Sequence, residues 1–219
     1  MTDDDHSEDV PSGIDLRDPG DATTWVAEAD QKRPWRADVR RAIAERVAEV
    51  GRARVLEAAR LGILVAARVH VLELGPGPGL LAEAILAACD VERYVLFDFS
   101  PPMLAFARQR LGDRARYVLG DYTKPDWPTA LEGPFDAVVA MQSVHEVRHK
   151  RHAPKLYAQV RTLLRPGGVL VVSDHEPTDS RPLFSSAGEQ LAAFAAAGFV
   201  DGTQHADVSG LYVCSATRA

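Results

Sequence analysis

The 219-residue chain is poor in cysteine, in aromatic residues and in long hydrophobic runs. Its two cysteines, Cys89 and Cys214, lie far apart and lack partners at metal-ligand spacing, so neither a disulfide framework nor a zinc site is predicted. Both are expected to be small buried residues. The longest apolar stretch, residues 191–200, is too short to span a bilayer, and the acidic N-terminus does not resemble a secretory signal. We therefore expect a cytoplasmic protein without a membrane partner.

Basic charge is also scarce. The net charge is −6, and residues 1–21 contain eight acids and one base, so the rest of the chain has 24 bases against 23 acids. A nucleic-acid-binding protein usually presents a basic face, whereas the bases here are scattered apart from a cluster at residues 148–152. A nucleic acid is therefore not expected as a partner. The length and the 46% hydrophobic content predict one globular core.

The N-terminal part of the chain divides into two predicted regions. Residues 1–21 are rich in Asp, Gly, Pro and Ser without apolar periodicity, which predicts a disordered or loosely attached acidic tail. Residues 22–67 are predicted to form a helical region. Apolar residues recur at helical spacing over residues 38–50, and Gly51 is expected to end that helix before a second one at 53–66.

The remaining residues, 68–219, alternate between strand and helix patterns. This alternation predicts an α/β domain with a doubly wound parallel sheet, where ligands bind beyond the carboxyl ends of the strands. Only residues 206–210 separate the last two strands, so the last strand must run antiparallel to its predecessor and the sheet is mixed. The seven predicted strands are 69–74, 94–98, 116–120, 136–141, 169–174, 199–205 and 211–216. Helices are predicted at 80–88, 102–111 and 154–164. A further helix is expected to begin after a cap at Ser185 or Ser186 and to end near Gly198.

The strongest motif, VLELGPGPGL at residues 71–80, runs from a strand through three alternate glycines into a helix. Glycines there let a ligand approach the backbone. The dinucleotide pattern G-x-G-x-x-G would need a glycine at Leu80, and the intervening prolines stiffen the turn, so a diphosphate site is poorly supported. Glu73 would repel phosphate and suits an ammonium or sulfonium group. The alternative is a tight strand-to-helix turn.

Two further strands end in acids. Asp98 follows the second strand and could accept both hydroxyls of a ribose, while Asp121 and Tyr122 follow the third and suit the amino group and ring face of adenine. Each acid alone would more often be a turn former or a helix cap. Their joint spacing favours one nucleoside pocket.

The motifs VLELGPGPG, FDFSPPML, GDYTKPDW, PFDAVVAMQSVHEV and LLRPGGVLVVSDHEP occur in the order typical of class I S-adenosylmethionine-dependent methyltransferases, which residues 69–216 resemble. The resemblance implies the seven-stranded, Rossmann-like methyltransferase sheet and S-adenosylmethionine as cofactor. It implies that the methionyl part contacts Glu73, Gly75, Gly77 and Gly79, and that the ribose binds Asp98. It further implies that adenine contacts Phe99 and Met103, with Asp121 and Tyr122 at its amino edge. Gln142 would also line the pocket.

The segment 141–149 lies where the family varies with its substrate. It lacks the Asn-Pro-Pro-aromatic sequence of enzymes that methylate nucleobases or glutamine amides, which by analogy predicts a small-molecule acceptor. His145 and His175 are candidate catalytic bases at one rim of the sheet. The alternative for His145 is a hydrogen bond to a backbone group or a helix cap.

Two other readings of this region are less favoured. His145, Glu146 and His149 formally match H-E-x-x-H, but the motif follows a sheet strand, so no metal is predicted. His149 and His152 are expected at a solvated helix start; the alternative is a cluster that binds an anionic acceptor.

In related enzymes the N-terminal region often forms a lid. Trp25 would then exclude water from the sulfonium and shape the acceptor pocket; alternatively Trp25 and Trp35 pack a helix onto the sheet. The predicted function is methyl transfer from S-adenosylmethionine to an oxygen or nitrogen of a small-molecule acceptor. The alternative is a non-catalytic protein that binds S-adenosylmethionine or S-adenosylhomocysteine (SAH).

Overall fold

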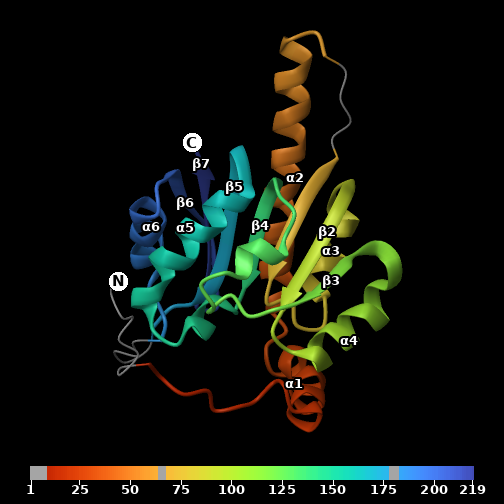
Figure 1. The fold of residues 1–219 in the computed structure, drawn as a ribbon, viewed down its shortest axis with the longest axis vertical. Coiled ribbons are helices and arrows are strands. Elements are labelled where there is room, and N and C mark those ends of the chain that lie inside the picture. The colour runs from red at the N-terminus through yellow and green to blue at the C-terminus, as the bar shows by residue number, and fades with distance from the viewer. Residues whose placement is uncertain (1–8, 64–67, 178–182) are drawn as a thin grey trace.

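The computed structural model describes residues 9–63, 68–177 and 183–219. Its centre is one seven-stranded sheet with the order β3-β2-β1-β4-β5-β7-β6 (Figure 1). β7 runs antiparallel to both of its neighbours and the other pairs are parallel, which confirms the predicted fold class. The strands are β1 (Val69–Leu74), β2 (Val91–Asp98), β3 (Arg116–Leu119), β4 (Phe135–Met141), β5 (Leu164–His175), β6 (Phe199–Val208) and β7 (Leu211–Arg218).

Helices cover both faces of the sheet and bury two apolar layers. α5 (Ala153–Leu163) and α6 (Ala187–Ala196) pack on one face. On the other face lie α2 (Arg36–Arg60), α3 (Leu80–Ala88) and α4 (Pro101–Leu111). All seven residues of β4 are buried, as expected for a central parallel strand with helices on both sides. The remaining elements are α1 (Pro19–Lys32) and the 3₁₀ turns η1 (Gly112–Arg114), η2 (Trp127–Ala130), η3 (Val144–Val147) and η4 (Lys150–His152).

The prediction that Gly51 separates two helices is wrong. α2 is continuous through a buried Gly51, and its far end extends beyond the sheet (Figure 1). Arg54 fixes this half of the helix, because its guanidinium lies 2.9 Å from the carboxylate of buried Asp136 and donates to the carbonyl of Arg68. These contacts offset the cost of a helical glycine, about 1 kcal/mol. The last residues of the second predicted helix, 64–66, lie outside the described residues.

The prediction of a loosely attached tail is wrong for residues 9–21. The backbone amide of Val10 donates to the carbonyl of Arg148 at 2.9 Å, and the hydroxyl of Ser100 donates to the carbonyl of Leu16. α1 already begins at Pro19, where the carboxylate of Asp18 caps it by accepting two backbone amides. These hydrogen bonds involve backbone and polar groups, so hydrophobic periodicity could not reveal them. Residues 1–8 of the predicted tail lie outside the described residues.

Elsewhere the predicted elements differ from the observed ones mainly at their ends. β1 and α3 have the predicted bounds, and Ser186 caps α6 through a capping box with Glu189. β5 begins at Leu164, earlier than predicted, because that residue pairs with Phe135 of β4. Both cysteines are free, with Cys214 buried and Cys89 half-buried. No helix among the described residues is long and apolar enough to cross a membrane.

Candidate functional site

A cavity opens at the carboxyl ends of β1, β2 and β4, where α1 and the start of α2 form its outer wall. It brings together eight of the residues predicted for the site: Glu73, Gly75, Gly77, Asp98, Phe99, Met103, Tyr122 and Gln142. Four others, Gly79, Asp121, His145 and His175, do not line this cavity. The site is therefore formed by strand ends that lie far apart in sequence.

The three glycines after β1 have distinct structural roles. All three have positive φ values, at 63°, 54° and 82°. A Cβ on Gly75 would lie only 2.5 Å from the Cβ of Ser143, so a side chain there would overlap the loop after β4. Gly77 faces the cavity and lies beside Trp25. Gly79 is instead a packing residue, because its Cβ would meet α4 at Ala107 and Leu111.

Glu73 is almost fully buried at 2% exposure. Its carboxylate accepts a hydrogen bond of 2.6 Å from the hydroxyl of Tyr94. Burial raises the pKa of Glu73 to about 8, although the hydrogen bond from Tyr94 opposes the shift. A cationic ligand in this cavity would therefore favour the ionised form of Glu73.

Asp98 is the second buried acid of the cavity. It accepts hydrogen bonds from the backbone amides of Ser100 at 2.9 Å and Gly77 at 3.3 Å. Burial raises the pKa of Asp98 to about 6, while these amides lower it. At neutral pH the carboxylate is ionised, and it points into the cavity as a hydrogen-bond acceptor.

The residues predicted to contact adenine lie between the cavity and a second hollow beside it. Phe99 and Tyr122 line both the cavity and the adjacent hollow, which is also lined by Asp121. Asp121 accepts a hydrogen bond from the hydroxyl of Thr123 at 2.6 Å and lies 3.7 Å from the guanidinium of Arg17. That guanidinium also lies over the ring of Phe99. Asp121 is therefore next to the cavity without lining it.

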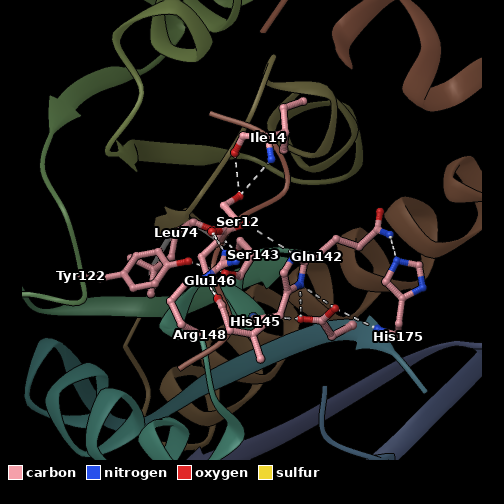
Figure 2. A network of polar contacts seen from close by, with 12 residues as sticks. Ser12, Ile14, Leu74, Tyr122, Gln142, Ser143, His145, Glu146, Arg148 and His175 are labelled. Atoms are coloured by element: carbon pink, nitrogen blue, oxygen red, sulfur yellow. Dashed lines mark hydrogen bonds and ion pairs between the residues drawn. The ribbon is translucent and has the colours of Figure 1, made fainter. Parts of the chain in front are cut away.

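Gln142 and His175 point toward each other at the ends of β4 and β5 (Figure 2). The amide nitrogen of Gln142 donates to Nε2 of His175 at 2.7 Å, which places the ring proton of neutral His175 on Nδ1. The amide oxygen of Gln142 is buried without a hydrogen-bond partner among the described residues. An acceptor atom is thus free for a ligand at this end of the cavity.

His145 is turned away from the cavity. Its Nδ1 lies 3.0 Å from both carboxylate oxygens of Asp174, and its ring packs on Phe184. Burial lowers the pKa of His145, but the charge of Asp174 and the hydrogen bond to it outweigh burial and raise the pKa overall. The ring of His145 therefore does not face a ligand in the cavity, and its partner is the carboxylate of Asp174, which differs from the backbone group or helix cap of the alternative.

This geometry predicts that His145→Asn destabilises the protein most at low pH. A raised folded-state pKa means that the stabilisation is fully present below about pH 6.5 and is lost as the pH rises through the folded-state value. The difference in free energy of unfolding between the wild type and the variant, measured by urea denaturation at pH 6 and pH 9, should be larger at pH 6. An equal difference at both pH values would contradict the charged pair.

The H-E-x-x-H match does not place its histidines on one helix face. Val144–Val147 forms the 3₁₀ turn η3, and Arg148 ends it with a φ of 68°. The neighbouring basic residues contact the N-terminal segment instead: Nε of Arg148 donates to the carbonyl of Val10 at 2.7 Å, and His152 lies 2.9 Å from the carboxylate of Asp9. In the structure Arg148 and His152 thus contact Val10 and Asp9 of the same chain.

Trp25 and Trp35 lie in different surroundings. Trp25 on α1 lines the cavity and stands over Gly77, whereas Trp35 packs against the core under α2. Sequence reasoning missed several lining residues from the N-terminal part of the chain, because their proximity to the glycine loop depends on how α1, α2 and the segment before α1 dock. These are Leu16, Val26, Ala29, Asp30, Arg36 and Arg40. Met141, Ser143 and Glu146, which also line the cavity, belong to the segment 141–149.

Comparison with a family model matches residues 71–168 to a methyltransferase domain. Several curated proteins are similar to this chain, and two of them serve as examples. Trans-aconitate 2-methyltransferase from Delftia acidovorans is 37% identical over 105 residues, which cover 47% of this chain and 37% of that protein. Demethylmenaquinone methyltransferase from Thermus thermophilus is 32% identical over 110 residues, covering 49% and 47%. The chain thus matches less than half the length of these relatives.

Solved structures share the fold at lower sequence identity. The DhpI–SAH complex is 20% identical, covers 96% of this chain and 99% of that one, and gives a TM-score of 0.66. The CurJ carbon methyltransferase is 20% identical, covers 69% and 49%, and gives a TM-score of 0.59. The likeness to DhpI therefore extends over α1 and α2 as well as the sheet.

Proposed function

We propose that the protein, whose residues 71–168 match a methyltransferase domain, transfers a methyl group from S-adenosylmethionine to an oxygen or nitrogen atom of a small-molecule acceptor. One observation carries the proposal. Two buried acids, Glu73 and Asp98, flank the glycine loop inside a single cavity that α1 covers.

The residues present fit this cofactor. Asp98 would accept the ribose hydroxyls, and Phe99 and Met103 would contact the adenine ring, with Asp121 and Tyr122 at its amino edge. The free amide oxygen of Gln142 and the carboxylate of Glu73 would accept the ammonium group of the methionyl part. Gly75 and Gly77 leave room for that part beside the backbone. The cofactor supplies an electrophilic methyl group, activated by its positive sulfur.

The protein's contribution is then to position the reactants and to exclude water. Trp25 and Val26 of α1 lie over the glycine loop, where they would separate the reacting centre from solvent. Among the described residues no histidine lines the cavity, so His145 and His175 are not placed to take a proton from the acceptor. His175 would act indirectly, by orienting Gln142.

Glu73 gives the proposal a pH signature. SAH should bind more tightly as the pH rises through about 8, because ionised Glu73 attracts the ammonium group of the ligand. In Glu73→Gln this increase should be absent. Calorimetric titration of both proteins with SAH between pH 6 and pH 9 measures the difference, and the ligand's own titration cancels in the comparison. If the affinity for SAH changed with pH in the same way in the wild type and in Glu73→Gln, Glu73 would not contact the ammonium group.

Turnover distinguishes an enzyme from the non-catalytic alternative. The purified protein is incubated with methyl-labelled S-adenosylmethionine and a panel of carboxylates, phenols and amines, and SAH formation is measured. Labelled product with at least one acceptor supports the enzyme. Cofactor binding without acceptor-dependent SAH would favour the binding protein. Because the similar proteins include a carbon methyltransferase, the methylated atom is identified by mass spectrometry of the product.

A further inference from the structure

The cavity has a charged end that binding of the cofactor does not use. Arg36 and Arg40, from the first turns of α2, line the cavity together with Asp30 of α1. Arg40 is satisfied, because its guanidinium donates to both carboxylate oxygens of Asp30 at 3.1 and 2.8 Å. The guanidinium of Arg36 lies 3.3 Å from one oxygen of the same carboxylate, which already accepts from Arg40. Two cations therefore share one anion at this end.

Arg36 is unusual for a surface-helix arginine. It is 7% exposed, and its Nε is buried without a hydrogen-bond partner among the described residues. Its guanidinium lies 5.2 Å from the centre of the Trp25 ring, which holds it at the cavity wall. Burial lowers the pKa of Arg36 to about 10, so it remains charged at neutral pH. A buried arginine with an unused donor is costly unless a ligand completes its hydrogen bonds.

The charges of the cavity are segregated. Glu73 and Asp98 lie at the ends of β1 and β2, where they suit a cationic, hydroxyl-bearing cofactor. Arg36 lies on the outer wall of the cavity, in the first turn of α2. An acceptor bound between the sulfonium and Arg36 would therefore experience positive charge on two sides.

From this arrangement we infer that the acceptor is a small-molecule carboxylic acid whose carboxylate pairs with Arg36 and is methylated on oxygen. The inference rests on the proposed function. One carboxylate oxygen would accept hydrogen bonds from the guanidinium while the other forms the new carbon–oxygen bond. The methyl carbon–sulfur bond breaks, sulfur keeps its electron pair, and the products are a neutral methyl ester and a thioether.

The same chemistry explains why no histidine among the described residues lines the cavity. A carboxylic acid is already ionised at neutral pH, so the transfer releases no proton and needs no base. Neutral phenols and protonated amines would each have to lose a proton during the reaction or before it. The position of His145 outside the cavity, paired with Asp174, is consistent with an acceptor that arrives as an anion.

The test compares acceptors and two matched arginine variants. Wild-type protein should methylate mono- and dicarboxylates and should not methylate the corresponding carboxamides, phenols or amines. Arg36→Met should lower kcat/KM for the carboxylates at least about 100-fold, mostly through KM, because it removes the charge-assisted hydrogen bonds from the guanidinium to one carboxylate oxygen. Arg41→Met is the control: it removes the same charge from an exposed position of the same helix, outside the cavity, and should leave kcat/KM unchanged.

Two further measurements separate the causes of failure. Calorimetry with SAH should give the same affinity for Arg36→Met and wild type; loss of SAH binding by the wild type would overturn the proposed function itself. Arg36→Lys, which keeps the charge but not the planar fork, should retain the fold and show an intermediate KM. Three results, each obtained with SAH binding intact, would overturn the carboxylate assignment. These are methylation of neutral acceptors only, no methylation of any carboxylate, and unchanged kcat/KM in both Arg36 variants.

Discussion

Asp98→Ala is expected to weaken SAH binding by about 100-fold. The proposed contacts to two ribose hydroxyls are hydrogen bonds to a charged group, each with a contribution of about 1.5 kcal/mol or more, and about 3 kcal/mol corresponds to that factor. The carboxylate is already oriented by the amides of Ser100 and Gly77, so little is lost in ordering it when the ligand binds. Isothermal titration calorimetry measures the change.

Asp113→Ala is the matched control for this prediction. Asp113 is an exposed acid in η1 and lines neither the cavity nor the adjacent hollow. Its replacement removes the same charge from the domain and should leave the affinity for SAH unchanged. The fold of both variants is checked by circular dichroism. Similar affinities for Asp98→Ala and wild type, with both folded, would remove Asp98 from the binding site.

Gly75→Ala is expected to destabilise the protein by about 2–4 kcal/mol. A non-glycine residue at φ 63° costs about 1 kcal/mol, and overpacking adds about 1–3 kcal/mol. The overlap is hard to relieve, because the new Cβ would lie 2.5 Å from the Cβ of Ser143, a residue held on both sides. Its hydroxyl donates to the carbonyl of Leu74 at 2.8 Å, and its carbonyl accepts from the hydroxyl of Tyr122 (Figure 2).

A double mutant separates the two contributions. Gly75→Ala combined with Ser143→Gly removes the overlap and should recover part of the loss, leaving the backbone cost. Gly188→Ala, in the first turn of α6 with no atom near the new methyl group, should be neutral or slightly stabilising. Urea denaturation gives the four free energies of unfolding. A loss in Gly75→Ala that Ser143→Gly does not reduce would contradict contact between the two loops.

The sequence was sufficient for the sheet and for the positions of Glu73 and Asp98 at its edge, because both depend on local patterns. Strand runs such as Val69–Leu74 are read from consecutive apolar residues, and Glu73 and Asp98 are placed by the rule that parallel strands end at one edge. The turn after β1 could likewise be predicted, since its positive φ values require glycine.

What the sequence could not reveal depends on tertiary placement. His145 pairs with Asp174 only because β4 and β5 align Met141 with Ser173 and η3 then turns the ring back toward β5. Arg36, at the start of α2, lines the cavity together with α1, which covers the strand ends. The first residues of α1 belong to the segment that the sequence predicted to be a tail. Neither relation has a period or a motif that a single sequence displays.

The most direct test of the account is a calorimetric titration of the purified protein with S-adenosylmethionine, SAH and NAD at one fixed salt concentration and pH. The proposed cofactor site predicts micromolar binding of the first two and no binding of NAD, because the loop has Leu80 where a dinucleotide site needs glycine. Absence of binding by both S-adenosyl compounds, or binding of NAD in their place, would contradict it and leave the glycine loop as a structural turn.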